Sequence, residues 1–279
     1  MLEINDGTNY INVFDNITEV ADYVTKKPRK EGRDHSSENT DDSSWYGTRS
    51  FDEAIDFLKY GDEKLYNKVK KEKSKINIDK ILGNARKRQT YENKVYGCVP
   101  NVPAYLIGTP LNMINSEIHA PSQKIINIFL NTRVNGGVDK DDVIKIGTKY
   151  LSIIDILEKQ GYRCNLYSGC ANSSWSDRHC YMLVKVKTDR EPLNIKKICF
   201  TIANPSMQRR IKFKWMEVND FSVDFTDGYG KNDEIEYTEK ILNEKLKDNF
   251  IVWTYEDAGS SKSIEKMIED LKKQGINIQ

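Results

Sequence analysis

One stretch, residues 125–168, most limits the folds that are open to this chain. It begins with an apolar run at 125–130, passes through a turn that contains two consecutive glycines, and continues as a long amphipathic segment to Gln160. A second apolar run starts at Tyr162. This order predicts a strand, a long helix and a second strand, an arrangement typical of α/β proteins.

Several independent signals mark the helix between those two strands. Asp139 is the expected N-cap, and three aspartates in the first turn suit the positive end of the helix dipole. Apolar side chains recur at spacings of three and four from Val143 to Leu157, so one face of the helix should be buried. Gly161 supplies the expected stop. A helix of about 20 residues is roughly 30 Å long, enough to cross a sheet and return the chain for a parallel strand.

The apolar runs at 162–167 and 179–186 are joined by a polar loop without a helix. Such a connection favours an antiparallel pair, and the lysines that end the second run are typical of a sheet edge. The sequence therefore predicts an α/β fold with a mainly parallel, doubly wound sheet and an antiparallel edge strand. A smaller helical N-terminal region should precede it.

Composition divides the chain into four predicted parts. Residues 1–26 carry a short strand and a helix, and residues 27–44 are polar and charged, as expected of a flexible linker. Residues 45–98 should be helical and basic, and a capping box at Ser50 opens the first helix. Residues 99–279 should form the α/β domain.

Two further stretches are punctuated by proline. Residues 98–113 contain several turn formers and should join the helical region to the α/β domain, with a strand at 102–107. Asn204 and Pro205 should separate two helices, with Asn204 as the N-cap of the second.

Composition excludes some classes of protein. With 38% hydrophobic and 30% charged residues, the chain of 279 residues can build a core, and its length suits one large domain or two small ones. No apolar run approaches the roughly 20 residues of a membrane span, and the N-terminus lacks the basic and apolar regions of a secretory signal. Five cysteines are an odd number for a disulfide framework, so we expect an intracellular protein with reduced thiols and no membrane partner.

Charge is uneven along the chain, although the net charge is only +1. Residues 59–94 hold 12 basic and 5 acidic side chains, whereas residues 215–279 hold 8 basic and 15 acidic ones. A basic region can bind nucleic acid or an acidic partner, but it can equally be a set of solvated helix faces. The candidate binding residues are Lys68, Lys70, Lys71, Lys73, Arg86, Lys87 and Arg88, together with a compact stripe of Arg209, Arg210, Lys212 and Lys214.

The cysteine and histidine cluster consists of Cys164, Cys170, His179 and Cys180. Its spacing matches no usual zinc pattern, and adjacent strand residues point to opposite faces, so His179 and Cys180 should not ligate one metal. We interpret the thiols as buried and structural, with a zinc site and a Cys–His nucleophile as the alternatives. The sequence has no phosphate-loop, dinucleotide-binding, zinc-protease or nucleophile-elbow motif, and we expect no cofactor.

The order of predicted elements from Lys124 to Gln279 resembles a von Willebrand factor A domain. That family has a doubly wound sheet and often binds a divalent metal through an Asp-x-Ser-x-Ser motif after its first strand. At the matching positions this chain has Asn131, Arg133 and Asn135. A metal would lose its carboxylate ligand and meet a cation there, so the resemblance implies a fold whose metal site is inactive.

A second resemblance is local. Residues 44–54, Ser-Trp-Tyr-Gly-Thr-Arg-Ser-Phe-Asp-Glu-Ala, and residues 204–210, Asn-Pro-Ser-Met-Gln-Arg-Arg, are similar to a family of uncharacterised proteins encoded by tailed bacteriophages. This similarity implies a viral origin, and no functional residue carries over from it. From the residues themselves, we expect Trp45 and Phe51 to anchor the start of a capped helix by packing.

Together these observations favour a non-enzymatic protein that acts by binding other proteins. We expect it to be phage-encoded, to reside in the host cytoplasm or the virion, and to work in virion assembly or structure or in the control of a host process. Its partner would be a viral or host protein, and a homo-oligomer is also compatible. The alternative is a nucleic-acid-binding protein that uses the basic N-terminal helices, and a metal enzyme is the third class.

Overall fold

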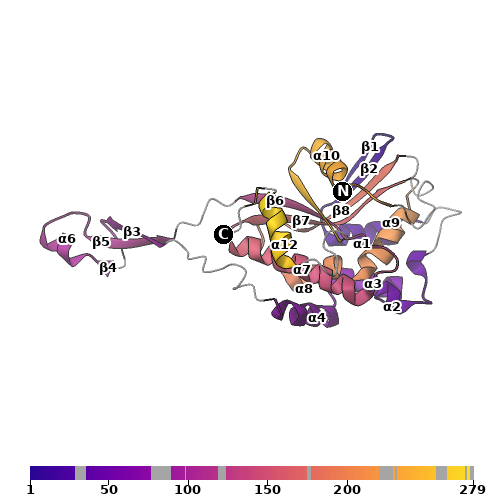
Figure 1. Cartoon of the computed structure of the whole chain (residues 1–279), viewed down its shortest axis with the longest axis horizontal. Coiled ribbons are helices and arrows are strands. Elements are labelled where there is room, and N and C mark those ends of the chain that lie inside the picture. The colour runs from indigo at the N-terminus through magenta and orange to yellow at the C-terminus, as the bar shows by residue number, and fades with distance from the viewer. Residues whose placement is uncertain are drawn as a thin grey trace.

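The computed structural model describes most of the chain, in two parts that we call the main body and the arm (Figure 1). The described residues are 1–28, 36–76, 89–97, 99–118, 124–174, 177–219, 229, 231–255, 263–273 and 275–276. The arm comprises residues 89–118, and the main body comprises the other described residues. Each part has its own sheet.

The main body is built on one mixed sheet. Its strands are β1 (Leu2–Asn5), β2 (Asn9–Phe14), β6 (Ile125–Asn131), β7 (Arg163–Ser173), β8 (His179–Lys187), β9 (Lys231–Asn232) and β10 (Phe250–Thr254). They are ordered β1-β2-β8-β7-β6-β10, and β9 pairs with the end of β7. Three of the five pairings along this order are parallel, namely β2 with β8, β6 with β7 and β6 with β10. The predicted α/β class and the mostly parallel central sheet are confirmed.

Strand β8 is antiparallel to β7, as predicted, but it does not lie at the sheet edge. It lies between β7 and β2, and the whole of β2 pairs in parallel with residues 179–184 of β8. The edge position was predicted from the lysines at the end of β8, which were expected to be exposed. Lys187 is instead buried and forms an ion pair with Glu158. The edges of the main sheet are β1 and β10.

The structure also crosses the predicted boundaries between parts of the chain. Strands β1 and β2 come from residues 1–26, so this segment belongs to the α/β body and is not a separate unit. Residues 36–44, expected in a flexible linker, contain the 3-10 turn η1 (Ser36–Glu38) and begin a helix. The boundary expected at residue 99 falls inside the arm.

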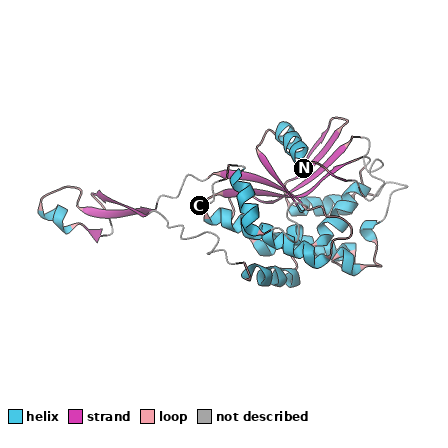
Figure 2. Ribbon diagram, in the orientation of Figure 1, coloured by secondary structure: helices cyan, strands magenta, loops and turns pink. Residues whose placement is uncertain are grey.

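Helices cover both faces of the main sheet (Figure 2). They are α1 (Ile17–Lys26), α2 (Ser43–Tyr46), α3 (Phe51–Tyr60), α4 (Glu63–Ser74), α7 (Lys140–Lys159), α8 (Ile195–Ala203), the π-helix η2 (Met207–Lys212), α9 (Phe213–Glu217), α10 (Ile235–Leu246) and α12 (Ile264–Lys273). Within the described residues, α10 packs on one face and the others gather on the opposite face. No helix in this part of the chain is long and apolar enough to cross a bilayer.

Local sequence signals set the helix ends as predicted. Asp139 caps α7 by accepting a hydrogen bond from the amide of Asp141 at 3.0 Å. Ser50 caps α3 by accepting one from the amide of Glu53 at 3.1 Å. Gly61 follows α3 with φ of 88°, a conformation that favours glycine, and its amide closes the last turn.

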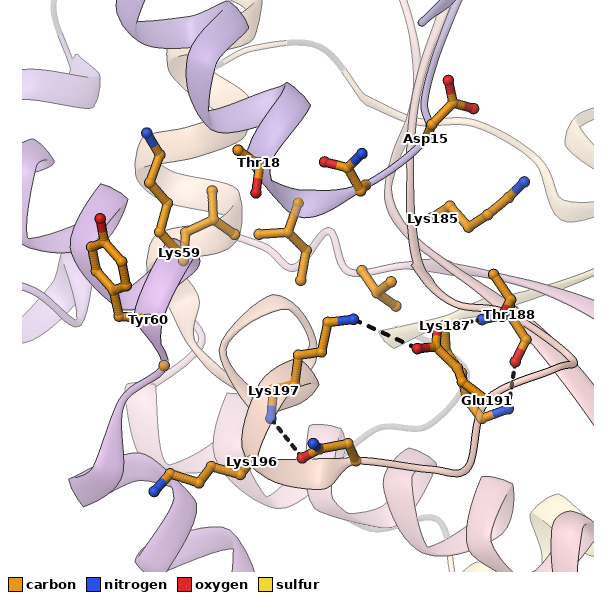
Figure 3. A pocket seen from close by; sticks show the side chains of 16 residues that line it. Asp15, Thr18, Lys59, Tyr60, Lys185, Lys187, Thr188, Glu191, Lys196 and Lys197 are labelled. Atoms are coloured by element: carbon orange, nitrogen blue, oxygen red, sulfur yellow. Dashed lines mark hydrogen bonds and ion pairs between the residues drawn. The ribbon is translucent and has the colours of Figure 1, made fainter.

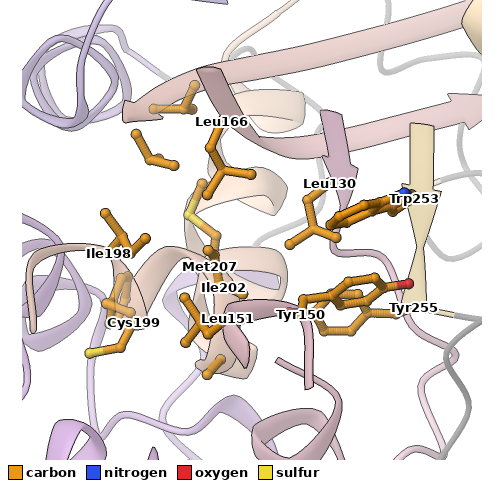
Figure 4. Close-up of a cluster of buried hydrophobic side chains, with 14 of the residues drawn as sticks. Leu130, Tyr150, Leu151, Leu166, Ile198, Cys199, Ile202, Met207, Trp253 and Tyr255 are labelled. Carbon is orange, nitrogen blue, oxygen red and sulfur yellow. The ribbon is translucent and has the colours of Figure 1, made fainter. Parts of the chain in front are cut away.

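A large apolar core lies between the sheet and the helices α7 and α8 (Figure 4). Tyr150 of α7 stacks on Trp253 and Tyr255, with ring centroids 5.4 and 5.6 Å apart. Helices α7 and α8 approach closely at Gly147, where a Cβ would lie 2.7 Å from the Cα of Ala203. This core fixes the predicted strand–helix–strand unit β6-α7-β7 in place.

The arm is a three-stranded antiparallel sheet with one short helix. Its elements are β3 (Gln89–Lys94), β4 (Val99–Pro100), α6 (Val102–Leu106) and β5 (Met113–Ile118), in the strand order β3-β5-β4. Two predictions fail here, since β3 begins in a region predicted to be helical and the strand predicted at 102–107 is the helix α6. The signal for α6 was present in the sequence, because Asn101 caps it through the amide of Ala104 and Pro103 occupies its first turn.

Candidate functional site

The predicted basic stripe lies inside the protein. Arg209 and Arg210 are 1% and 0% exposed, and Lys212 and Lys214 are 2% and 7% exposed. The prediction that they form a surface for nucleic acid or a partner is therefore wrong for the folded main body. All four side chains lie in or beside η2. A π-helix often marks a functional or strained segment. The contacts of each cation show which role these residues have.

Arg210 binds the backbone of the segment that precedes α3. Its guanidinium donates hydrogen bonds to the carbonyls of Ser37 at 2.9 Å, Asn39 at 3.1 Å and Thr48 at 3.0 Å. It also donates to the Thr48 hydroxyl at 2.8 Å and lies 4.2 Å from the centre of the Tyr46 ring. These acceptors and the ring replace water around the charge, so Arg210 is a structural cross-link between η2 and that segment.

Arg209 connects the same segment to the turn before α7. Its guanidinium donates to the carbonyls of Trp45 at 2.6 Å and Val138 at 2.8 Å, and it lies 4.2 Å from the centre of the Trp45 ring. Burial lowers the pKa of Arg209 to about 10, which still leaves the side chain cationic at neutral pH. One buried cation thus holds together three segments that are distant in the sequence.

The two segments that resemble the phage family, residues 44–54 and 204–210, contact each other. The Ser206 hydroxyl donates a hydrogen bond to a backbone carbonyl of the first segment at 2.6 Å. Gly47 approaches Pro205 so closely that a Cβ would lie 2.8 Å from the proline ring. The two motifs therefore form one packed unit, a contact that the sequence did not predict.

The buried charge of Lys212 has fewer compensating contacts than the charges of Arg209 and Arg210. Its ammonium group is buried and has no hydrogen-bond partner within the described part of the chain. Burial lowers the pKa of Lys212 to about 8, with a further lowering by Arg133 and an opposing effect of the Cys170 and Cys180 thiols. The folded chain therefore favours the neutral amine more than the unfolded chain does.

The predicted lysines of α4 lie at or near the surface. Lys68, Lys70 and Lys71 are exposed and Lys73 is partly buried. Lys68 and Lys73 lie 3.5 and 2.7 Å from aspartates of α7, so part of this charge is used within the main body. The remaining predicted residues, Arg86, Lys87 and Arg88, lie outside the described residues.

The predicted cysteine cluster consists of buried thiols. Cys164, Cys170 and Cys180 are fully buried, and burial raises their pKa values, that of Cys164 to about 12. Cys180 packs in the core under α7 and α8, whereas His179 lies against Tyr237 of α10 on the other face. The predicted burial of the thiols is confirmed, and so is the prediction that His179 and Cys180 point to opposite faces of the sheet. Across the described ranges, no group of three or more His, Cys, Asp or Glu side chains is placed to hold a metal ion.

A polar cluster that the sequence did not predict surrounds Asp233, just before α10. Its carboxylate accepts a hydrogen bond from the Tyr181 hydroxyl at 2.5 Å and lies 3.0 Å from Nδ1 of His179. Burial is the larger of two effects that raise the pKa of Tyr181 above its ordinary range, and the nearby carboxylate of Asp233 is the other. No nucleophilic side chain is hydrogen bonded to the imidazole among the described residues, so the geometry is that of a link between β8 and α10.

The positions that match the degenerate metal motif are engaged within the fold. The side-chain amide of Asn131 donates to the carbonyl of Ala171 at 3.4 Å, and its oxygen accepts from the amide of Arg133 at 3.2 Å. Asn135 is exposed, and its carbonyl closes a turn by accepting from the amide of Val138 at 3.0 Å. These positions offer amides and a cation, whereas divalent cations such as magnesium are held through carboxylates.

The pocket in Figure 3 is rich in lysine, but ion pairs neutralise much of its charge. It has a volume of about 380 Å³ and lies where the N-termini of α1 and α8 meet the end of β8. Lys59, Lys187 and Lys196 form ion pairs with carboxylates of residues that do not line the pocket. Lys197 lies 3.7 Å from Glu191 at its rim. The pocket is therefore a weak candidate for an anion site.

The arm carries the largest group of exposed apolar side chains in the described residues. Each is between 47% and 80% exposed, and they are Val95, Tyr96, Val99, Val102, Tyr105, Leu106, Ile107 and Leu111. In the main body the comparably exposed apolar residues are Met1, Leu2, Tyr60 and Ile125. Exposed apolar surface concentrated in one region is typical of an interaction site, so the arm is the strongest candidate.

The sequence held a signal for this surface that motif analysis missed. Residues 95–116 contain no Asp, Glu, Lys or Arg, although 30% of the chain is charged. Ala104 is the one buried side chain that the structure describes in the arm. Among the described residues this charge-free segment buries little apolar surface of its own, which is why it is the candidate interaction surface.

Comparison with known proteins identifies a family, but the description of that family names no activity. Residues 3–277 match the family described as "Domain of unknown function (DUF7192)". The chain belongs to this family. No curated protein and no solved structure matches this DUF7192 chain. The resemblances to von Willebrand factor A domains and to phage proteins stay predictions.

Replacing Arg210 by methionine should destabilise the main body of this DUF7192 protein by at least about 3 kcal/mol, because buried carbonyls lose their donors. Arg210→Lys should lose much of the same stability, since an ammonium group cannot reproduce the guanidinium fork. Urea unfolding monitored by tryptophan fluorescence measures both effects. Lys70→Met removes an exposed cation and is the control, with an expected change within about 0.5 kcal/mol. An Arg210→Met protein as stable as this control would contradict the structural role.

Replacing Lys212 by methionine should stabilise the protein near neutral pH. The folded pKa of about 8 lies below the ordinary 10.5, so the buried cation costs stability below pH 8 and this cost disappears as the pH rises towards 10.5. The advantage of Lys212→Met over the natural chain should therefore shrink by on the order of 3 kcal/mol between neutral and strongly alkaline pH. Denaturant titrations of both proteins across this range measure it. A pH-independent difference would contradict the buried-cation interpretation.

Proposed function

We propose that this DUF7192 chain is a non-enzymatic, phage-encoded protein that works through protein–protein contacts made by its arm. It acts in virion assembly or structure or in the control of a host process, in the host cytoplasm or the virion. The observation that carries the proposal is the cluster of exposed apolar side chains between residues 95 and 111. The viral origin is supported by the resemblance of residues 44–54 and 204–210 to proteins of tailed phages.

The chemistry of the main body supports a binding role over catalysis. The cations of η2 are used to hold the fold together, and the candidate thiols are buried with raised pKa values, which disfavours the reactive thiolate. The His179–Asp233 pair lacks a hydrogen-bonded nucleophile within the described residues. The arm, in contrast, has exposed aromatic and aliphatic side chains, which supply most of the energy at protein interfaces.

A finer proposal concerns the fold of the main body. We propose that it is a doubly wound domain of the von Willebrand factor A type with an inactive metal site. Support comes from the parallel neighbours β7, β6 and β10, from the helix α7 between β6 and β7, and from α10 on the opposite face. The asparagine at position 131 and the arginine at position 133 support the loss of the metal.

Nucleic-acid binding remains the second candidate function, and one observation favours it. Lys70 and Lys71 are exposed on α4, next to the exposed Lys68. Exposed cations on a helix can contact a phosphate backbone, and binding of this kind weakens steeply as the salt concentration rises. Salt dependence therefore separates this function from an apolar protein contact.

Affinity purification of the full chain from cells that naturally express it tests the proposal, with proteins and nucleic acid both identified. The natural chain is compared with the double variant Leu106→Glu/Ile107→Glu and with Tyr60→Glu, which changes an equally exposed residue of the main body. We expect a stoichiometric protein partner that survives high salt, is lost with the double variant and is kept with Tyr60→Glu. Recovery of salt-sensitive nucleic acid without a protein partner would contradict the proposal and favour α4.

A further inference from the structure

We propose that a pocket between α2, α3, α4 and α7 binds the phosphate group of a small ligand. These helices lie in the lower part of the main body in Figure 1, so the site is independent of the protein contacts proposed for the arm. The pocket has a volume of about 340 Å³, and residues of both segments 44–54 and 204–210 line it. Because these two segments pack against each other, the pocket lies where they meet.

The lining of the pocket contains more cations than carboxylates. The cations are Arg49, Lys64, Lys68 and Lys140, and the carboxylates belong to Glu53 and Asp62. Both carboxylates already accept a backbone amide near the start of a helix, at 2.5 Å for Glu53 and 3.0 Å for Asp62. Four cations less two carboxylates give the lining a formal charge of +2, which favours an anionic ligand.

Two of these cations have no ion-pair partner in the described parts of the chain. Arg49 and Lys64 are exposed, and no described carboxylate lies within 4.0 Å of either charged group. Lys140 makes one hydrogen bond of 3.5 Å to a backbone carbonyl, and Lys68 lies 3.5 Å from Asp141. This pocket therefore differs from the one in Figure 3, where carboxylates neutralise much of the charge.

A buried amide provides a hydrogen-bond donor in a fixed position. Asn204 lines the pocket and is only 5% exposed. Its side-chain oxygen accepts a hydrogen bond from the amide of Ser206 at 2.9 Å, which fixes the orientation of the side chain. The NH2 group of Asn204 has no acceptor among the described residues. Because a buried donor without an acceptor costs stability, a ligand that brings an acceptor explains this side chain.

Two long helices begin at the pocket and add to its positive potential. Asp62, the N-cap of α4, and Lys140, the first residue of α7, both line it. The amino end of a helix carries a partial positive charge that favours phosphate groups. These helix ends do not define the site alone, but they act on the same space as the cations and the Asn204 amide.

The unpartnered groups and the volume define the class of ligand. Arg49, Lys64 and the NH2 group of Asn204 are all donors, so the ligand should present several acceptors on an anion, as a phosphate does. The volume of about 340 Å³ lies in the range of small-molecule sites, about 300 to 1,000 Å³. The side chains of Ser43 and Phe57 also line the pocket and offer contacts to an organic group. The pocket therefore favours a phosphate ester over the free ion.

Isothermal titration calorimetry of the full chain with inorganic phosphate, ribose 5-phosphate and ribose tests the proposal. We expect a Kd of about 1 mM or lower for ribose 5-phosphate and no binding of ribose. Arg49→Gln/Lys64→Gln should weaken phosphate binding at least about tenfold, because charge-assisted hydrogen bonds are lost. The control Arg190→Gln/Lys272→Gln also removes one arginine and one lysine, both exposed and outside the lining. It should bind within about twofold of the natural chain.

A further variant tests the buried amide. Asn204→Asp keeps an oxygen for the amide of Ser206 but replaces the NH2 donor by a second oxygen of a carboxylate, which repels phosphate. We expect this variant to lose phosphate binding, with circular dichroism to show that it is folded. The double variant at Arg49 and Lys64 changes exposed side chains only, so it tests the site even if Asn204→Asp does not fold.

Three results would overturn the proposal. The first is a natural chain that binds neither phosphate compound, and the second is ribose that binds as tightly as ribose 5-phosphate. The third is an Arg49→Gln/Lys64→Gln protein that binds phosphate as tightly as the control. Tighter binding of ribose 5-phosphate than of inorganic phosphate supports an ester as the ligand, whereas equal binding supports the free ion.

Discussion

Two buried arginines hold the helical side of the main body together. Arg209 and Arg210 extend from a π-helix and direct their guanidinium groups at backbone carbonyls of the segment between η1 and α3. Removing two cations from water is costly, and here carbonyl acceptors and the rings of Trp45 and Tyr46 offset the loss of hydration. The segment that they bind has little regular structure of its own, so its position depends on these contacts.

This use of charge shapes what the protein can bind. The cations that would make an obvious surface for phosphate are turned inward, and the lysine-rich pocket beside α1 and α8 has much of its charge paired. The strongest feature left at the described surface is the opposite of a charged patch, namely the exposed apolar side chains between residues 95 and 111 of the arm. A stable α/β body that presents an uncovered apolar arm is suited to building an assembly, in which other chains complete the arm.

Local patterns predicted the local structure. The strand–helix–strand unit β6-α7-β7, the cap at Asp139 and the stop at Gly61 followed from spacing and capping residues, because those signals act within a few positions. The burial of Arg209 and Arg210 could not be predicted in this way, since their acceptors lie between 71 and 173 residues away. The central position of β8 was missed for the same reason, as its neighbour β2 lies near the N-terminus. Residues 95–116 of the arm are recognisable in the sequence as a charge-free stretch, but their exposure only becomes known from the structure.

Hydroxyl-radical footprinting of the full chain, free and assembled, measures most directly whether the arm is the interaction surface. Side chains that are exposed when the chain is free should lose reactivity on assembly at Tyr96, Tyr105 and Leu106. Tyr60 on the main body should react equally in both states, since it lies outside the interface. Full reactivity of the three arm residues in the assembled state, with protection appearing on α4 instead, would contradict the arm as the binding surface.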